Sequence, residues 1–145
     1  MKDPKTIAYW IITALVAFVF FGSGAANAAQ VPEVLENITR LGYPAYFAVI
    51  LGSWKILAAL ALLAPGLPRL KEWAYAGLTF AMSGAFISHV ASGDPIGASI
   101  PPLIVLALVW ASWALRPESR RLPSPNTVTA HNTVHTHAKP AAATS

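Results

Sequence analysis

Hydrophobic positions in this chain fall into long runs instead of alternating with polar ones. The runs cover about 7–26, 45–63, 73–90 and 98–115, and charged residues lie almost entirely between them. A helix needs about 20 apolar residues to cross the hydrocarbon core of a membrane. The pattern therefore predicts an all-α integral membrane protein with four transmembrane helices.

The connections between these runs are short, and residues 65–68 and 93–95 are rich in Pro and Gly. Short connections favour antiparallel neighbours, and irregular backbone is unstable against lipid. We therefore expect a compact four-helix bundle within residues 1–116. The first connection differs, because residues 32–42 place apolar side chains at helical spacing between an initial proline and a terminal glycine. They are predicted to form a short amphipathic helix at the membrane surface.

Basic residues near the ends of the runs are distributed unequally. Seven lie at the amino terminus, before the third run or after the fourth, whereas Arg40 alone lies on the opposite side. Since cytoplasmic connections are enriched in Lys and Arg, both termini are predicted to be cytoplasmic. A cleavable signal peptide is the alternative for the first run, because Ala26-Asn27-Ala28 forms an A-x-A site. Cleavage would leave the orientation of the other helices unchanged.

Composition supports a membrane protein and narrows its chemistry. Charged residues make up 11% of the chain, against about 25% in soluble domains. The absence of cysteine excludes disulfides and thiolate metal sites. The net charge of +4 comes without a basic run interleaved with aromatics, so nucleic acid is not an expected partner. Residues 117–145 are predicted to form a disordered cytoplasmic tail, and no metal site is expected there, because His131, His135 and His137 have no carboxylate beside them.

Lys55 is the main exception to the placement of charge, because it lies near the middle of the second run. A charged side chain there costs about 2.5–3.5 kcal/mol and usually faces a cavity or a partner. A lysine that snorkels, or that only fixes helix packing, is the alternative. The other polar residues of the outer half place a candidate polar pocket, open to the non-cytoplasmic side, at Lys55, His89, Asp94, Asn27, Ser23 and Ser88.

His89 and Asp94 lie five residues apart across a predicted helix end. An imidazole paired with a carboxylate can relay protons or bind a quinone carbonyl. The alternatives are a structural hydrogen bond for His89 and a turn role for Asp94. At the cytoplasmic interface, Glu72 stands beside Arg69 and Lys71, where it suits the helix dipole or could reach toward Lys55.

No hydrolase, nucleotide-binding or metalloprotease motif occurs in the chain. We therefore assign no catalytic residue, and we expect the isolated chain not to be an enzyme. No cofactor is evident from the sequence, and a quinone is the one candidate.

Several segments within residues 7–116 instead carry a family resemblance. They include Leu51-Gly52-Ser53-Trp54-Lys55, Pro68-Arg69-Leu70-Lys71-Glu72-Trp73-Ala74-Tyr75-Ala76-Gly77 and Ser88-His89-Val90-Ala91-Ser92-Gly93-Asp94. With them the sequence resembles the DoxX-like family of small bacterial membrane proteins. The resemblance implies a four-helix bundle in the bacterial inner membrane, and more distant relatives act in quinone-linked oxidation or oxidative-stress complexes.

Three functions remain open from the sequence. The first is an accessory protein, non-catalytic by itself, that binds a small lipophilic ligand or a redox partner complex in the lipid bilayer. The second is a subunit of a quinone-coupled oxidoreductase, of thiosulfate or quinol oxidation type, in which Lys55, His89 and Asp94 contact the quinone. The third is a small transporter, which would need a homo-oligomer because four helices leave little room.

Overall fold

The computed structural model of the chain describes residues 3–122. Within that range it contains no strand, which confirms the predicted all-α class. In order along the chain, the helices are α1 (Pro4–Ala28), α2 (Pro32–Arg40), α3 (Ala45–Leu63), α4 (Pro68–Ala91), α5 (Ile96–Ala114) and a single 3₁₀ turn, η1 (Glu118–Arg120).

The helix ends follow from local sequence. Proline occupies the first turn of α1, α2 and α4, where its missing N–H costs nothing. Gly42 and Gly93 follow α2 and α4 with φ of +89° and +70°, a backbone conformation that glycine adopts without strain. These turns reverse the chain before α3 and α5.

Three helices, α1, α3 and α5, are long and apolar enough to cross a membrane. Helix α4 is 24 residues long but more polar, because its first turns carry Arg69, Lys71 and Glu72. A fourth crossing by α4 therefore stays a prediction.

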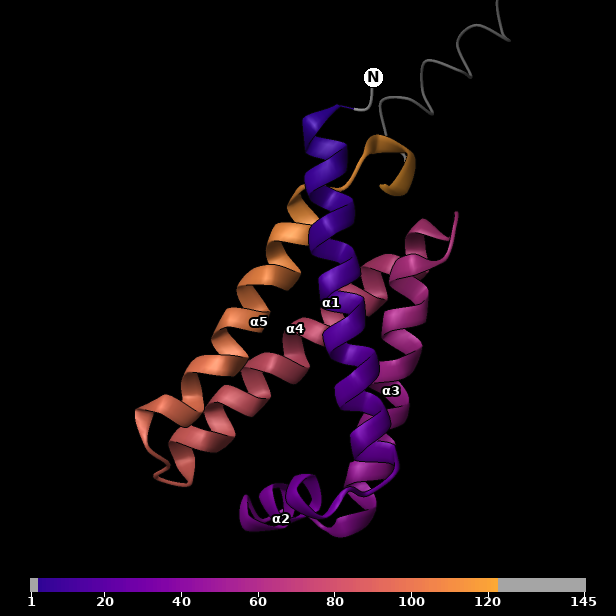
Figure 1. Cartoon of the computed structure of the whole chain (residues 1–145). Helices are drawn as coiled ribbons and strands as arrows, with labels where there is room; N and C mark the ends of the chain where they lie inside the picture. Colours follow the sequence, from indigo (N-terminus) through magenta and orange to yellow (C-terminus); the bar gives the residue numbers. More distant parts are fainter. Residues whose placement is uncertain (1–2, 123–145) are drawn as a thin grey trace, which may run out of the picture.

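The helices pack as two antiparallel pairs, α1 with α3 and α4 with α5 (Figure 1). Contacts of α3 with α4 and of α1 with α5 join the pairs. The pairs diverge toward the end of the molecule that carries α2 (Figure 1). The core lies where they converge, around Val16, Phe20, Leu62, Tyr75, Leu78 and Val109.

Small residues allow α1 and α3 to approach closely. A Cβ atom added to Gly52 would lie 2.5 Å from both the backbone nitrogen of Ala28 and the carbonyl oxygen of Gly24. Close backbone contact through small residues is the usual way in which helices associate in lipid. The α1–α3 pair is thus the more closely packed of the two pairs.

A buried polar cluster joins the two pairs in the core. The Ser112 hydroxyl lies 2.7 Å from the Thr13 hydroxyl and 2.7 Å from the Tyr75 hydroxyl, and the side chains come from α5, α1 and α4 respectively. Each of the three hydroxyls thus has another as its hydrogen-bond partner, as buried polar groups usually do. This cluster was not predicted from the sequence.

The chain remains folded a short distance beyond residue 116, where the predicted tail begins. Arg120, in η1, donates hydrogen bonds to the Tyr9 hydroxyl at 3.3 Å and to the Leu62 carbonyl at 3.1 Å. The rest of the predicted tail, 123–145, including its histidines, lies outside the described residues.

Candidate functional site

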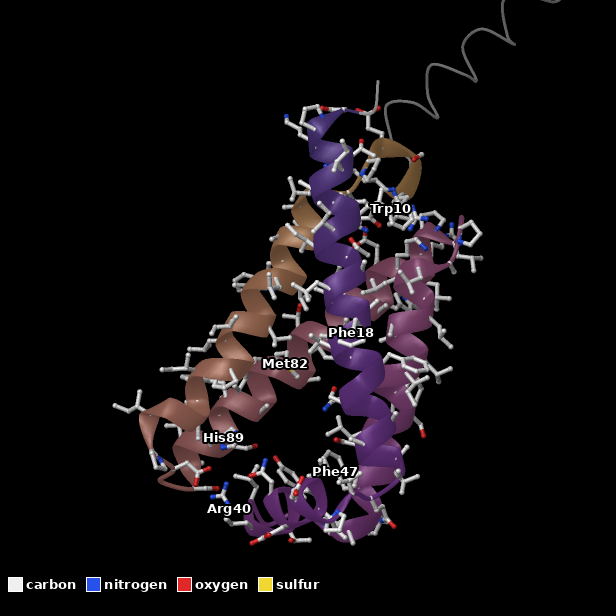
Figure 2. All side chains as sticks on the ribbon, viewed as in Figure 1. Trp10, Phe18, Arg40, Phe47, Met82 and His89 are labelled. Atoms are coloured by element: carbon white, nitrogen blue, oxygen red, sulfur yellow. The ribbon has the colours of Figure 1, made fainter. Side chains whose placement is uncertain are left out.

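A cavity of about 640 Å³ lies between the helix pairs at the α2 end. Residues of α1, α2, α3 and α4 line it, together with Tyr43 from the α2–α3 connection. In Figure 2, Arg40, Phe47 and His89 lie around this region, on α2, α3 and α4 respectively. The cavity therefore exists because the two pairs diverge there and α2 packs across the space between them.

The structure places four of the six predicted pocket residues on the cavity wall. They are Asn27, Lys55, Ser88 and His89. Asp94 lies just outside the lining and contacts His89. Ser23 is not among the lining residues, because its hydroxyl points toward its own helix, 3.5 Å from the Phe20 carbonyl oxygen.

Lys55 lies in the middle of α3, where it is half-buried and lines the cavity. Among residues 3–122 no carboxylate or hydrogen-bond acceptor pairs with its ammonium group. A lysine at that depth is normally paired or solvated. Its position on a cavity wall makes the ammonium group available to whatever fills the cavity.

At the mouth of the cavity, the Asp94 carboxylate contacts two side chains, the guanidinium group of Arg40 and the imidazole of His89. Arg40 donates to both carboxylate oxygens, and the bond from Nη2 to Oδ2 measures 3.1 Å. His89 Nδ1 lies 2.6 Å from the same Oδ2. The Asp94 side chain is only 7% exposed, whereas Arg40 reaches in from α2 with 48% of its side chain exposed.

These contacts fix the charge of Asp94 and the orientation of His89. The hydrogen bond from Arg40, and then that from His89, holds the pKa of Asp94 below its ordinary value. The same ion pair raises the pKa of Arg40 above its ordinary value. With a proton on Nδ1 facing the carboxylate, the Nε2 atom of neutral His89 is left as a hydrogen-bond acceptor.

Tyr43 makes a second link across the mouth. Its hydroxyl lies 2.8 Å from the Ser88 hydroxyl on α4, and its ring stacks on Phe47 with centroids 4.8 Å apart. Arg40 and Tyr43 thus tie both ends of the α2–α3 connection to the end of α4. The helix predicted at 32–42 is found as α2, Pro32–Arg40, which forms a wall of the cavity, and its place at the membrane surface stays a prediction.

Sequence reasoning missed the roles of Arg40 and Tyr43. Arg40 is separated from Asp94 by 54 positions, so no local pattern connects them. Its isolation in the sequence could have pointed to this role, because Arg40 is the one basic residue in the connections on its side of the predicted membrane.

The residues predicted for the cytoplasmic interface lie at the opposite end of the molecule. Glu72 pairs with Arg116 at 2.8 Å and accepts a hydrogen bond from the Trp113 indole at 3.1 Å, so it does not reach Lys55. Lys71 is fully buried and donates to the Ala61 and Ala64 carbonyls at the end of α3. Arg69 is exposed. Between residues 3 and 122, no group of three or more metal-ligating side chains comes together.

Because the Arg40–Asp94 ion pair holds α2 at the mouth, we expect the distance between α2 and α5 to depend on pH. Because the folded pKa of Asp94 is depressed, its contacts stabilise the fold fully above the ordinary carboxyl pKa and are lost as pH falls through the lowered value. The chain has no native cysteine, so spin labels on Glu36→Cys and Ile96→Cys report the distance between α2 and the start of α5. We expect a narrow distance distribution at neutral pH that broadens in strong acid. In Asp94→Asn it should be broad at every pH, and an unchanged narrow distribution would contradict the prediction.

Comparison with known proteins identifies one family. Residues 11–112, from α1 to the last turn of α5, match the DoxX-like family. Searches of curated proteins and of solved structures find no match to the chain. The match covers more than half of the chain and includes every helix that lines the cavity, which confirms the resemblance seen in the sequence. The chain therefore belongs to the DoxX-like family of membrane proteins.

Proposed function

We propose that this DoxX-like protein crosses the bacterial inner membrane four times and binds a small lipophilic ligand in the cavity lined by α1, α2, α3 and α4. The fourth crossing is supported by helix direction. Helices α3 and α5 run the same way (Figure 1), so α4 must return the chain across the bilayer between them. At 1.5 Å per residue, 24 residues extend about 36 Å, which exceeds the ~30 Å hydrocarbon core.

The charge distribution supports an orientation with both termini in the cytoplasm. The amino terminus, the α3–α4 turn and the end of α5 share one end of the molecule (Figure 1), and that end carries Arg69, Lys71, Arg116, Arg120 and Arg121. The cavity mouth at α2 then faces the outer side of the membrane.

The observation that carries the binding function is Lys55 on the wall of a largely apolar cavity. Ligand sites typically combine apolar walls with a few polar groups that orient the ligand. Here Phe47, Leu51 and Phe80 provide apolar surface, while Lys55 and His89 provide polar contacts at different depths. The residues that line the cavity do not include a complete set of catalytic groups. We therefore assign the protein an accessory, ligand-binding role in a membrane redox or stress-response system, in which a partner protein supplies the chemistry.

Substitutions that fill the cavity test this function. A Cβ atom on Gly84 meets no atom within 4 Å, so leucine fits there and projects into the cavity that Gly84 lines. We expect Gly84→Leu and Lys55→Met to lose a lipophilic compound that copurifies with the parent protein in mild detergent, as measured by mass spectrometry of organic extracts.

The matched control is Gly22→Leu, where a Cβ is also free of contacts but no cavity is lined. It should retain the compound. The proposal fails if the parent protein carries no compound, or if all the variants carry it equally.

One contact favours a quinone-coupled oxidoreductase subunit as the second candidate. The 2.6 Å contact between His89 and Asp94 orients an imidazole at the cavity, a suitable donor or acceptor for a quinone carbonyl and its protons. In this case, membranes with His89→Gln or Asp94→Asn should lose quinone reduction while inserting the protein normally. Unchanged quinone reduction in both variants would exclude this candidate.

A further inference from the structure

A second hollow, a groove of about 410 Å³, runs between α3 and α4. Its lining is almost wholly apolar and includes Trp54 and Trp73, which are 67% and 78% exposed. Leu51, Lys55 and Ala81 line both this groove and the cavity. The groove and the cavity therefore adjoin at these three residues, and Lys55 stands between them.

The shape of the groove matches one hydrocarbon chain. From Leu51 to Ala61 the groove follows α3 for ten residues, which is about 15 Å along the helix. On the other side, it follows α4 from Ala81 back to Leu70. It leads away from the cavity toward the predicted cytoplasmic end.

We propose that the ligand is a single-chain amphiphile with an anionic head group. The head lies in the cavity against the Lys55 ammonium, and the chain leaves through the α3–α4 groove beside the lipid. This inference rests on the proposed binding function and names the ligand class for that site. A hollow between α4 and α5 shares no lining residue with the cavity, so it offers the second chain of a phospholipid no route from Lys55.

Charge complementarity favours an anionic head over a neutral one. Lys55 has no counterion among residues 3–122, and the carboxylate of Asp94 is already neutralised by Arg40. A carboxylate brought beside Lys55 cancels a charge that is expensive within the membrane, whereas an alcohol or a quinone leaves that charge in place.

Substitutions at two glycines of α4 test the position of the head group and the position of the chain independently. Gly77 lines the groove and Gly84 lines the cavity, about two turns apart. A Cβ atom at either position meets nothing within 4 Å, so each can carry leucine. Gly22→Leu again serves as the matched control outside both hollows.

The probe is a long-chain fatty acid with a photoactivatable diazirine at the end of its chain, added to the purified full chain in detergent. We expect cross-links on 57–63 and 70–78, located by peptide mass spectrometry, and displacement of the probe by oleate. Oleyl alcohol should displace it about tenfold to a hundredfold more weakly, because its hydroxyl can accept a hydrogen bond from Lys55 but carries no charge to pair with the ammonium group. Lys55→Met should bind oleate and oleyl alcohol equally.

The variants separate failure of this inference from failure of the binding function. Gly77→Leu should remove the cross-links from the groove, and Gly22→Leu should keep them. Labelling that depends on Gly84 but not on Gly77 would overturn the placement of the chain and leave the binding function standing. Equal displacement of the probe from the parent protein by oleate and oleyl alcohol would overturn the anionic head. Labelling spread evenly over α1 and α5, with none of the variants having an effect, would overturn both.

Discussion

Leucine in place of Gly52 is expected to separate α1 from α3 and to leave little folded protein. An added Cβ alone would lie 2.5 Å from two backbone atoms of α1, at Gly24 and Ala28, and backbone cannot move aside as a flexible side chain can. Overpacking a core commonly costs about 1–3 kcal/mol, and a clash with backbone belongs at the upper end of that range. This loss of folded protein should exceed that caused by the other single substitutions, because α1 and α3 together form the wall that carries Lys55.

The measurement is thermal unfolding in detergent, followed by circular dichroism, together with the yield of monodisperse protein. Gly52→Ala should already lower the unfolding temperature, whereas Gly22→Leu should leave it near that of the parent chain. If Gly52→Leu unfolded at the parent temperature, the close approach of α1 and α3 would be wrong.

The sequence predicted the helices well where apolar length alone decides them. Helix α3 spans Ala45–Leu63, the same bounds as the second apolar run. Helix α4 begins at Pro68, five residues before the third apolar run, because its polar first turn is also helical. Lys71 can be buried in that turn because it donates to carbonyls at the end of α3, a tertiary contact that hydropathy does not reveal.

Most of the candidate site was predictable from depth along the helices. Counting residues from the helix ends placed Lys55, Asn27 and His89 at depths that share one cavity. It also placed Ser23 there, on the same face of α1 as Asn27. Ser23 lies one turn nearer the end where the helix pairs converge, and its hydroxyl contacts the Phe20 carbonyl instead of lining the cavity.

The contacts across the mouth were beyond sequence reasoning because they depend on how the helix pairs diverge. Arg40 meets Asp94 only because α2 folds back beneath the space between α3 and α4. A straight, parallel bundle would leave no such space, and hydropathy does not encode the tilt of α4. Tyr43 and Ser88 meet for the same reason.

Removing the ion pair at the mouth is expected to expose the cavity. Arg40 binds both carboxylate oxygens of Asp94, so Arg40→Met removes two charge-assisted hydrogen bonds and leaves α2 linked to α4 through Tyr43. Cysteine introduced at Ala85, which lines the cavity, reports access, since the chain has no cysteine of its own. A polar thiol reagent should modify Ala85→Cys slowly in the parent background and several-fold faster after Arg40→Met or Asp94→Asn.

The double variant distinguishes a shared contact from two separate effects. If Arg40 and Asp94 act through one ion pair, Arg40→Met with Asp94→Asn should be no more reactive than the faster single variant, because the second change removes nothing further. Arg40→Lys should be intermediate, since lysine keeps the charge but cannot bind both oxygens in the planar fork that arginine provides. Additive acceleration in the double variant, or no acceleration in either single variant, would show that α2 is held over the cavity by other contacts.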